Sequence, residues 1–338
     1  MIKKLVSKKI WKEIKKAKSI LLTIHPSPDA DSVGSNLALY EVISKMGKKV
    51  TLIAGDSEFP QNMATLPNSN KVLPKNFFQI NQNDYDLFII ADISDKKRIS
   101  NQGEVKLSKH LKTICIDHHF SNQKFANINL IDVKSPATCQ LIYEFLQVNK
   151  IKITKNIANC LFIGIYADTG GFKYLNTTHK TFLIVSDLVK IYPKFNKTVF
   201  ELENNDKADR LKFLSLMFAA IKTYCSEKVA ISSIDFKTIQ ENNLDNSSVI
   251  HGSDIANSIK SVTGWEIGIS LIEVQPNLIK ISFRTRDPNK YDLTKVAAAL
   301  GGGGHKPAAG AVLNNMSLQK GIDLIIEKLQ KVYPDLRK

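Results

Sequence analysis

Short apolar runs alternate with longer amphipathic segments through the first half of the chain. Strands are predicted where the apolar runs are of strand length: 20–24, 48–54, 85–92 and 113–117. Helices are predicted over 8–18, from Asp31 or Ser32 to Met46, from an N-cap at Ser135 to Val148, over 154–166 and over 178–188. Residues 56–82 have no clear period and predict short irregular elements. This order favours an α/β domain with a mainly parallel sheet flanked by helices.

The pattern weakens between residues 191 and 208, which form a charged, Asn-rich stretch. We interpret this stretch as a linker, so that residues 1–190 form one domain and residues 209–338 a second, smaller α/β domain. The predicted elements of the second domain are a helix over 209–225, a strand over 228–234, a helix over 253–263, a hairpin over 266–275 and 278–285, a helix over 292–300, a strand near Ala311 and a helix over 317–333.

Composition narrows the class of protein only modestly. With 338 residues, 43% of them hydrophobic and 23% charged, the chain should form ordinary packed cores. The net charge of +15 invites a nucleic-acid interpretation, but only five of the 47 basic residues are Arg. A Lys-rich, Asn-rich composition is typical of an AT-rich genome, so the charge supports an anionic ligand weakly. Because Lys does not replace the bidentate guanidinium of Arg, Arg284 and Arg286 stand out as candidate phosphate ligands.

The cysteines and the apolar segments indicate a cytoplasmic protein without a membrane span. Four cysteines lie far apart in apolar surroundings and form no C-x-x-C pair, which fits buried thiols in a reducing compartment. The basic residues at the N-terminus lack the apolar run of a secretion signal. The longest apolar stretch, 158–167, is well short of the ~18 residues of a membrane span.

The segment His25-Pro26-Ser27-Pro28-Asp29-Ala30-Asp31 follows the first predicted strand and holds one imidazole and two carboxylates. An EF-hand loop is unlike it, because Val33 and Tyr40 stand where that loop needs oxygen ligands. A mixed nitrogen and oxygen set suits Mn²⁺, Fe²⁺ or Zn²⁺ better than Ca²⁺. On this segment alone, a solvated turn that caps the next helix is an equal alternative.

Later strands and helices end in the same kind of residue. Asp92 ends one apolar run, Asp117-His118-His119 ends another, and Asp168 follows a predicted helix. In a parallel sheet the carboxyl ends of strands share one edge, where α/β proteins place their sites. Each acid alone could cap a helix, but together they supply six ligands, enough for two divalent ions if one carboxylate bridges. The ligands are His25, Asp29, Asp31, Asp92, His118 and Asp168.

The second predicted domain carries a loop of four glycines followed by His305. Backbone amides of Gly302, Gly303 and Gly304 could approach a phosphate closely, and His305 could add a donor. A flexible connector is the alternative. The loop is not a Walker A motif, so ATP is not implied. Arg284 and Arg286 could hold another phosphate or stack on a base, and either could instead form a surface ion pair.

In order and spacing these motifs resemble those of the DHH phosphoesterases. The resemblance is carried by His25-x-x-x-Asp29-x-Asp31, Ala91-Asp92, Asp117-His118-His119 and Asp168-Thr169-Gly170, and the GGGGH loop with Ser282-Phe283-Arg284 resembles the DHHA1 domain. Residues 165–178 look most like the NrnA-like branch of short oligoribonucleases and pAp phosphatases. That branch commonly has Arg where this chain has Lys173.

The resemblance implies two divalent metal ions, with Mn²⁺ as the expected metal. His25, Asp29 and Asp92 would bind one ion; Asp31, Asp92, His118 and Asp168 would bind the other. Asp92 would bridge them. Asp117 would orient an imidazole, and His119 would contact the phosphate or protonate the leaving oxygen. Arg284, Arg286, Gly302, Gly303, Gly304 and His305 would bind substrate across a cleft.

The implied reaction is hydrolysis of RNAs a few nucleotides long to nucleoside 5′-monophosphates, with removal of the 3′-phosphate of pAp as a second activity. A linear dinucleotide such as pApA is the closest alternative substrate. A RecJ-like single-strand DNA exonuclease is a weaker alternative because the chain has no extra oligonucleotide-binding domain. A catalytically idle nucleic-acid-binding protein would have lost at least one ligand, and all six are present. The expected partner is a short RNA or nucleotide; no obligate protein partner is inferred, and a homodimer is left open.

Overall fold

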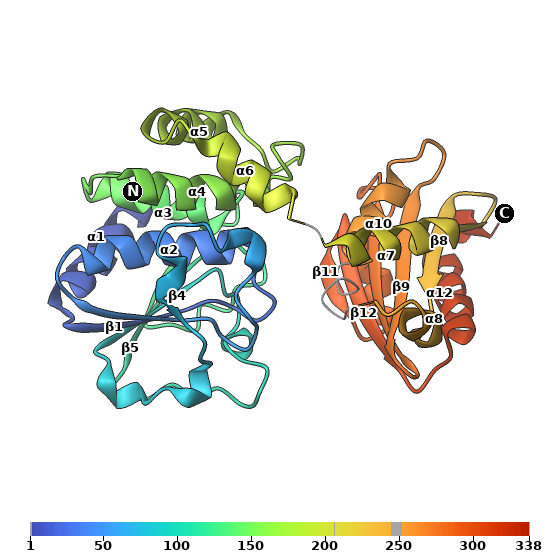
Figure 1. Ribbon diagram of the computed structural model, residues 1–338, viewed down its shortest axis with the longest axis horizontal. Helices are drawn as coiled ribbons and strands as arrows, with labels where there is room; N and C mark the ends of the chain where they lie inside the picture. The colour runs from blue at the N-terminus through green and yellow to red at the C-terminus, as the bar shows by residue number, and fades with distance from the viewer. Residues whose placement is uncertain (1, 206, 245–251, 338) are drawn as a thin grey trace. The chain divides into compact units, whose positions relative to one another are not determined.

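The structure, a computed structural model, describes residues 2–205, 207–244 and 252–337. The chain forms two compact units, Met1–Asn205 and Asp206–Lys338, each built on a six-stranded sheet (Figure 1). The predicted linker 191–208 includes the boundary between them. Part of that linker, however, is helix α6 (Phe195–Glu203), which packs on helix α4 (Lys155–Asp168) of the first unit.

The sheet of the first unit has the order β3-β2-β1-β4-β5-β6, and all neighbouring strands are parallel. Its strands are β1 (Ser19–Thr23), β2 (Lys49–Ile53), β3 (Val72–Leu73), β4 (Leu87–Ala91), β5 (Lys112–Asp117) and β6 (Ile128–Ile131). Its remaining helices are α1 (Ile2–Lys16), α2 (Ala30–Ser44), α3 (Thr138–Val148) and α5 (His179–Ile191). The four strands predicted from apolar runs are present. Strand β6 escaped prediction because it is short and contains Asn129.

Helices α1 to α4 pack on one face of this sheet, and short turns cover the other (Figure 1). Side chains of β1 show the division: Leu22 joins the core with the helices, and Leu21 joins the core with Phe77, Ile99 and Val105 from the connections. The connections on that second face include the 3₁₀ turns η3 (Phe77–Gln79), η4 (Gln82–Asp84) and η5 (Lys96–Arg98). Strand order runs one way from β1 to β3 and the other way from β4 to β6. Right-handed crossovers in opposite directions put the β1–β2 connection, which contains α2, and the connections after β4 on opposite faces.

The reversal of strand order lies between β1 and β4, which are hydrogen-bonded neighbours although α2, β2, β3 and four 3₁₀ turns separate them in sequence. In open α/β sheets such a switch point leaves a crevice at the carboxyl ends of the strands. Helices α2 and α4 approach closely beside it: a Cβ atom on Gly34 would clash with the carbonyl oxygen of Cys160. The fold thus brings the ends of β1, β4, β5 and α4 to one region.

The second unit has a mixed sheet with the order β11-β12-β10-β9-β8-β7. Its strands are β7 (Lys222–Tyr224), β8 (Val229–Ile234), β9 (Ile267–Gln275), β10 (Leu278–Thr285), β11 (Gly303–His305) and β12 (Ala308–Asn314). Its helices are α7 (Ala208–Ala219), α8 (Phe236–Glu241), α10 (Gly252–Lys260), α11 (Leu293–Ala299) and α12 (Leu318–Val332). The helix predicted over 209–225 ends earlier than expected, and β7 occupies its last residues.

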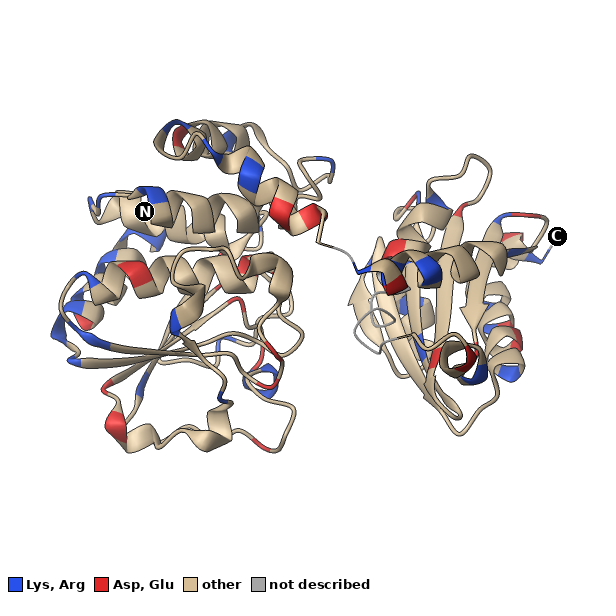
Figure 2. Ribbon diagram, in the orientation of Figure 1, with Lys and Arg blue, Asp and Glu red and all other residues tan. Residues whose placement is uncertain are grey.

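Two cores hold the second unit together. Helices α11 and α12 pack on one face of the sheet, and α7, α8 and α10 pack on the other, over β8, β9 and part of β10. None of the helices in the described ranges is long and apolar enough to cross a membrane. Figure 2 shows Lys and Arg residues spread over many elements of both units.

Candidate metal centre

Three overlapping groups of His and Asp side chains gather beyond the carboxyl ends of β1, β4 and β5. Within each group, one ligand atom from every residue lies within 4.8 Å of the others, close enough to hold a metal ion. The groups are His25, Asp29 and Asp92; Asp31, His118 and Asp168; and Asp92, His118 and His119. The folded chain therefore brings together all six side chains that the sequence predicts as ligands, and adds His119.

The imidazoles of His25 and His118 are fixed in the same way. Nδ1 of His25 lies 2.9 Å from the carbonyl oxygen of Pro26, and Nδ1 of His118 lies 3.2 Å from that of Ser135. Because a carbonyl oxygen only accepts hydrogen bonds, each Nδ1 carries a proton. In the neutral ring, Nε2 then keeps a lone pair and points to the carboxylates, as in a typical His ligand of a metal.

Asp92 lies between these two imidazoles. Its Oδ2 is 3.5 Å from Nε2 of His25, and its Oδ1 is 3.6 Å from Nε2 of His118. Its backbone φ of 63° is in the left-handed region, where strained residues of functional sites are concentrated. Thr138 donates a 3.0 Å hydrogen bond to Oδ1 and fixes the carboxylate. Each oxygen of Asp92 therefore faces a different group of ligands, which is what a bridging carboxylate requires.

Asp31 is fully buried in the first turn of α2. Its two oxygens accept hydrogen bonds of 2.6 Å and 2.8 Å from the amides of Thr138 and Cys139, the first residues of α3. Amides at the start of a helix have no partner within the helix, so Asp31 satisfies two of them. The carboxylate is thereby held in place from a second helix.

The starts of α2 and α3 differ from their prediction. The N-cap of α2 is Asp29, whose carboxylate accepts a 2.9 Å hydrogen bond from the amide of Ser32, and Asp31 lies inside the first turn. Helix α3 begins after Ala137, two residues later than Ser135 suggests. The sequence gives no local signal for the start of α3, because the carboxylate that accepts hydrogen bonds from its first amides belongs to the distant residue Asp31.

The carboxylates of the cluster perturb one another strongly. Burial and the charges of Asp92 and Asp29 hold the pKa of Asp31 well above its ordinary value. Burial and the neighbouring carboxylates raise the pKa of Asp168 in the same way, and Asp168 also ends helix α4, where the helix dipole disfavours an anion. Burial opposes a charged His25, but Asp29 and Asp92 outweigh it and raise the pKa of His25 to about 10. A divalent cation would relieve this repulsion, so the donor set fits a metal.

Asp117 and His119 form a hydrogen-bonded pair beside the cluster. Nδ1 of His119 donates a 2.7 Å hydrogen bond to Oδ1 of Asp117, and Asn122 donates one of 2.7 Å to Oδ2. Burial lowers the pKa of His119, but Asp117 and Asp92 outweigh it and raise that pKa. Because Asp117 holds Nδ1, Nε2 is the ring atom of His119 that remains for a ligand.

Two residues of this region escaped the sequence analysis, and a third, Arg98, had no role assigned from the sequence. Thr138 and Asn122 hold Asp92 and Asp117, yet neither belongs to a strand-end motif. Arg98 ends the 3₁₀ turn η5, and its charge lowers the pKa of His119, so the guanidinium lies near that ring. The signal that the sequence offered for Arg98 was its place as a basic residue six positions after Asp92.

The predicted substrate residues of the second unit fall into two sets. Arg284 on β10 pairs with Ala308, which pairs with His305 on β11, so Arg284 and His305 share a row across the sheet. Gly303 and Gly304 also belong to β11. The amide of Gly302, in contrast, donates a 2.8 Å hydrogen bond to the carbonyl of Ala297. That amide ends helix α11 and is not available to a phosphate, contrary to the prediction.

Arg286 also has a local role. Its Nη1 group donates to the carbonyl oxygens of Lys260, Ser261 and Val262 at distances of 3.3, 3.1 and 2.8 Å. These carbonyls end helix α10, and a cation there is favoured by the helix dipole. The contacts favour a structural role for this end of Arg286 over the predicted phosphate contact.

Comparisons with known protein families agree with this architecture. Residues 19–165 match the family model described as the DHH family, N-terminal domain, and residues 228–333 match the DHHA1 domain. The chain is a DHH–DHHA1 protein. The two matches fall within the two units of the structure.

Relatives of this DHH–DHHA1 protein span most of its length. It is 24% identical to the bifunctional oligoribonuclease and PAP phosphatase NrnA of Thermus thermophilus, over 92% of this chain and 89% of the relative. It is 26% identical to the protein of the same name from Mycoplasma genitalium, over 89% and 91% of the two chains. Among solved structures, an exopolyphosphatase-related protein from Bacteroides fragilis has a TM-score of 0.88 at 23% identity and covers 99% and 98% of the two chains. That structure supports the fold.

Proposed function

We propose that the protein is a metal-dependent phosphoesterase that hydrolyses short oligoribonucleotides to nucleoside 5′-monophosphates and converts pAp to AMP and phosphate. The relatives that carry both activities in their names span most of the chain, which supports the substrate class. A linear dinucleotide such as pApA is the two-residue case of the same reaction. We further propose a cytoplasmic location, which suits the four free cysteines.

Two divalent ions, with Mn²⁺ as our choice, would be held in two sites that share Asp92. The observation that carries this proposal is the direction of the Asp92 oxygens, one toward His25 and the other toward His118. When bound, such ions supply a water of lowered pKa and neutralise charge on the phosphoryl group. Asp29 would complete the first site, and Asp31 and Asp168 the second.

The protein's own residues would orient the substrate and supply a proton. His119, held through Nδ1 by Asp117, presents Nε2 and has a raised pKa, so it can bind a phosphate oxygen or protonate the leaving oxygen. The charge of Arg98 lies near the same ring. In the second unit, the row of Arg284 and His305 would bind a further phosphate of the substrate.

A comparison of substrates tests the proposed class. A 5′-labelled RNA dinucleotide, a labelled 24-mer and pAp are incubated side by side with the protein and Mn²⁺. We expect the dinucleotide and pAp to be hydrolysed much faster than the 24-mer. Equal or faster decay of the 24-mer would contradict a short-RNA enzyme and would favour an exonuclease that acts on long strands.

A variant at Asp92 tests the shared site. Asp92→Asn keeps an oxygen for Thr138 but removes the bridging charge, so we expect a loss of activity of about 10³-fold or more, the scale of a lost electrostatic contribution at an active site. Metal analysis should find two Mn²⁺ per wild-type chain and fewer in the variant. Glu104→Gln, at an exposed carboxylate that belongs to none of the three groups of ligands, serves as the control. Retained activity in Asp92→Asn would refute the bridging role.

A further inference from the structure

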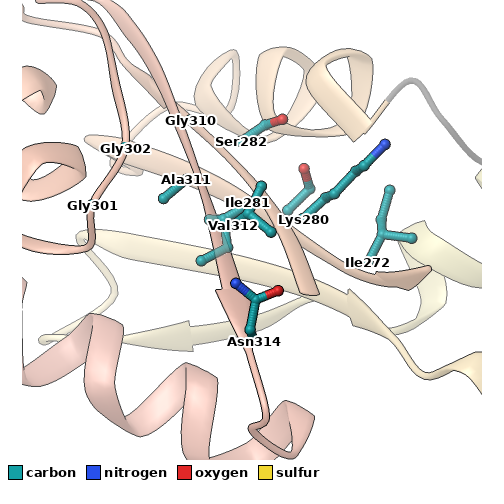
Figure 3. A pocket seen from close by; sticks show the side chains of 11 residues that line it. Ile272, Lys280, Ile281, Ser282, Gly301, Gly302, Gly310, Ala311, Val312 and Asn314 are labelled. Carbon is teal, nitrogen blue, oxygen red and sulfur yellow. The ribbon is translucent and has the colours of Figure 1, made fainter. Parts of the chain in front are cut away.

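An open trough of about 540 Å³ lies on one face of the sheet in the second unit (Figure 3). Figure 3 shows Gly301 and Gly302 along one side of it and the side chains of Lys280 and Ile272 along the other. Val312 and Asn314 of β12 line the trough between these sides. Apart from Gly301 and Gly302 of the four-glycine loop, none of these residues belongs to the motifs that predicted substrate binding.

The register of the strands explains why the face is hollow. Gly310, Ser282 and Ser270 pair in turn across β12, β10 and β9. Residues that face one another in register share one side of a sheet. This row therefore has small side chains on adjacent strands; Gly310 and Ser282 are partly exposed, and Ser270 on β9 is buried. The result is a floor on which a flat molecule can lie.

Rows on either side of this floor carry positive charge. On β10, Arg284 lies two residues after Ser282, in the row of His305. Lys280 lies two residues before Ser282, on the other side of the row of small residues. Four residues of a strand span ~13 Å, so the two cations stand about that far apart along β10. Within residues 207–244 and 252–337, no acidic side chain forms an ion pair with Lys280, which is exposed.

The row of Lys280 also supplies apolar surface. Val312 and Ile272 pair with Lys280 from the two neighbouring strands. Val312 is 48% exposed and lies beyond the last residue of β12 that pairs with β11, so its apolar side chain is open to a ligand. Small residues, exposed apolar surface and a cation at the far end are the combination that accommodates a sugar and base followed by a phosphate.

We propose that this trough binds the second nucleotide of the RNA, counted from the phosphate held by Arg284 and His305. The sugar and base lie over Gly310 and Ser282 against Val312, and Lys280 binds the following phosphate. This inference rests on the proposed function and deepens it, because it makes RNAs of three or more nucleotides better substrates than pAp or a dinucleotide. A bare polyphosphate would leave the apolar surface unused.

Replacing Lys280 by Gln tests the phosphate contact. We expect KM for an RNA tetramer to rise about five- to tenfold, the scale of one charge-assisted hydrogen bond at a partly exposed site, with kcat unchanged. The dependence of log KM on log salt concentration should weaken by about 0.7, the value for one lost phosphate contact on a single strand. Kinetics with pAp should not change. Lys331→Gln removes the same charge from α12, on the opposite face of the sheet, and should change none of these values.

A second variant tests the apolar surface. Val312→Glu places an anion in the trough at an exposed position, so we expect KM for the tetramer to rise at least as much as in Lys280→Gln while pAp hydrolysis persists. Normal kinetics with pAp show that either variant is folded. Inorganic tripolyphosphate should compete with the tetramer poorly; strong competition that is lost in Lys280→Gln would overturn the assignment to a nucleotide.

Direct binding separates this inference from the proposed function. Fluorescence anisotropy with a labelled RNA tetramer in EDTA measures affinity without hydrolysis. If wild-type protein hydrolyses no RNA, the proposed function fails, and binding that depends on Lys280 still supports the trough. If wild-type protein hydrolyses the tetramer and pAp, but Lys280→Gln matches Lys331→Gln in KM, salt dependence and affinity, the trough proposal is overturned while the proposed function stands.

Discussion

Asp168→Asn should change stability in opposite directions without and with metal. In the metal-free protein, Asp168 ends helix α4, and burial and the nearby carboxylates raise its pKa. Its folded-state pKa therefore lies above the unfolded value, and ionisation at neutral pH destabilises the fold. Asn has the same shape but no charge, so the substitution removes this cost in the absence of metal and removes a ligand in its presence.

The expected size follows from the contacts. Relief of the unfavourable helix dipole is worth about 0.3–1 kcal/mol, and relief of repulsion among the carboxylates adds to it. The lost 3.2 Å contact between Oδ2 of Asp168 and Nε2 of His118 offsets part of the gain. We therefore expect about 1 kcal/mol of stabilisation, or a rise in Tm of about 2–4 °C for a unit of this size. With Mn²⁺ at 100 times its Kd, the wild-type protein should gain about 2.7 kcal/mol, and the variant clearly less.

Thermal unfolding of the full chain, in EDTA and across a Mn²⁺ titration, measures both effects. The variant should melt above the wild type in EDTA and below it at saturating Mn²⁺. Glu104→Gln also removes one carboxylate, at a side chain that is 71% exposed, and should shift neither curve. A variant that is destabilised in EDTA, or that Mn²⁺ stabilises as much as the wild type, would refute the placement of Asp168 in a crowded cation site.

Three further predictions concern the surroundings of the cluster. Asp117→Asn should lower kcat about 10²-fold with little change in KM and should move the alkaline limb of the pH profile for kcat to lower pH, because His119 acts in its protonated form and loses the carboxylate that raises its pKa; an unchanged profile would contradict that pairing. Gly164→Ala would place a Cβ atom against Sγ of Cys139 and 2.9 Å from Oδ1 of Asp31, and should weaken Mn²⁺ binding in a titration; unchanged affinity would contradict a ligand role for Asp31 that depends on this close packing. The pKa of His25 is raised from 6.5 to about 10 in the folded protein. Metal-free protein should therefore lose free energy of unfolding, measured with urea, as pH rises from 6.5 to about 10. A free energy of unfolding that does not change over this range would argue against the contacts of His25 with Asp29 and Asp92.

Much of the fold could be predicted from local sequence. Apolar runs located β1, β2, β4 and β5, and the hairpin turn at Pro276-Asn277 lies between β9 and β10 as expected. Errors fell where the local signal was weak or misleading: the helix predicted to run to residue 225 ends at Ala219, and Lys222–Tyr224 form strand β7 instead of prolonging α7. The two-residue strand β3 and the four-residue strand β6 are too short to have a readable period.

Candidate site residues were predictable for the same reason that the strands were. A carboxylate or imidazole at the end of an apolar run is visible in sequence, which identified Asp92, His118 and their neighbours. Contacts through residues distant in sequence were not visible. Thr138 fixes Asp92 across 46 positions, and Arg286 caps α10 across more than 20, so their roles depend on folding.

The sequence by itself determined which side chains carry the chemistry and which strand or helix ends present them, because those properties depend on residue type and local period. Only the tertiary structure decided how they divide into groups. The directions of the two Asp92 oxygens, the carbonyl that fixes His118, and the row of small residues next to Lys280 follow from how separate segments meet in the fold. These are relations between distant segments, which no local pattern encodes.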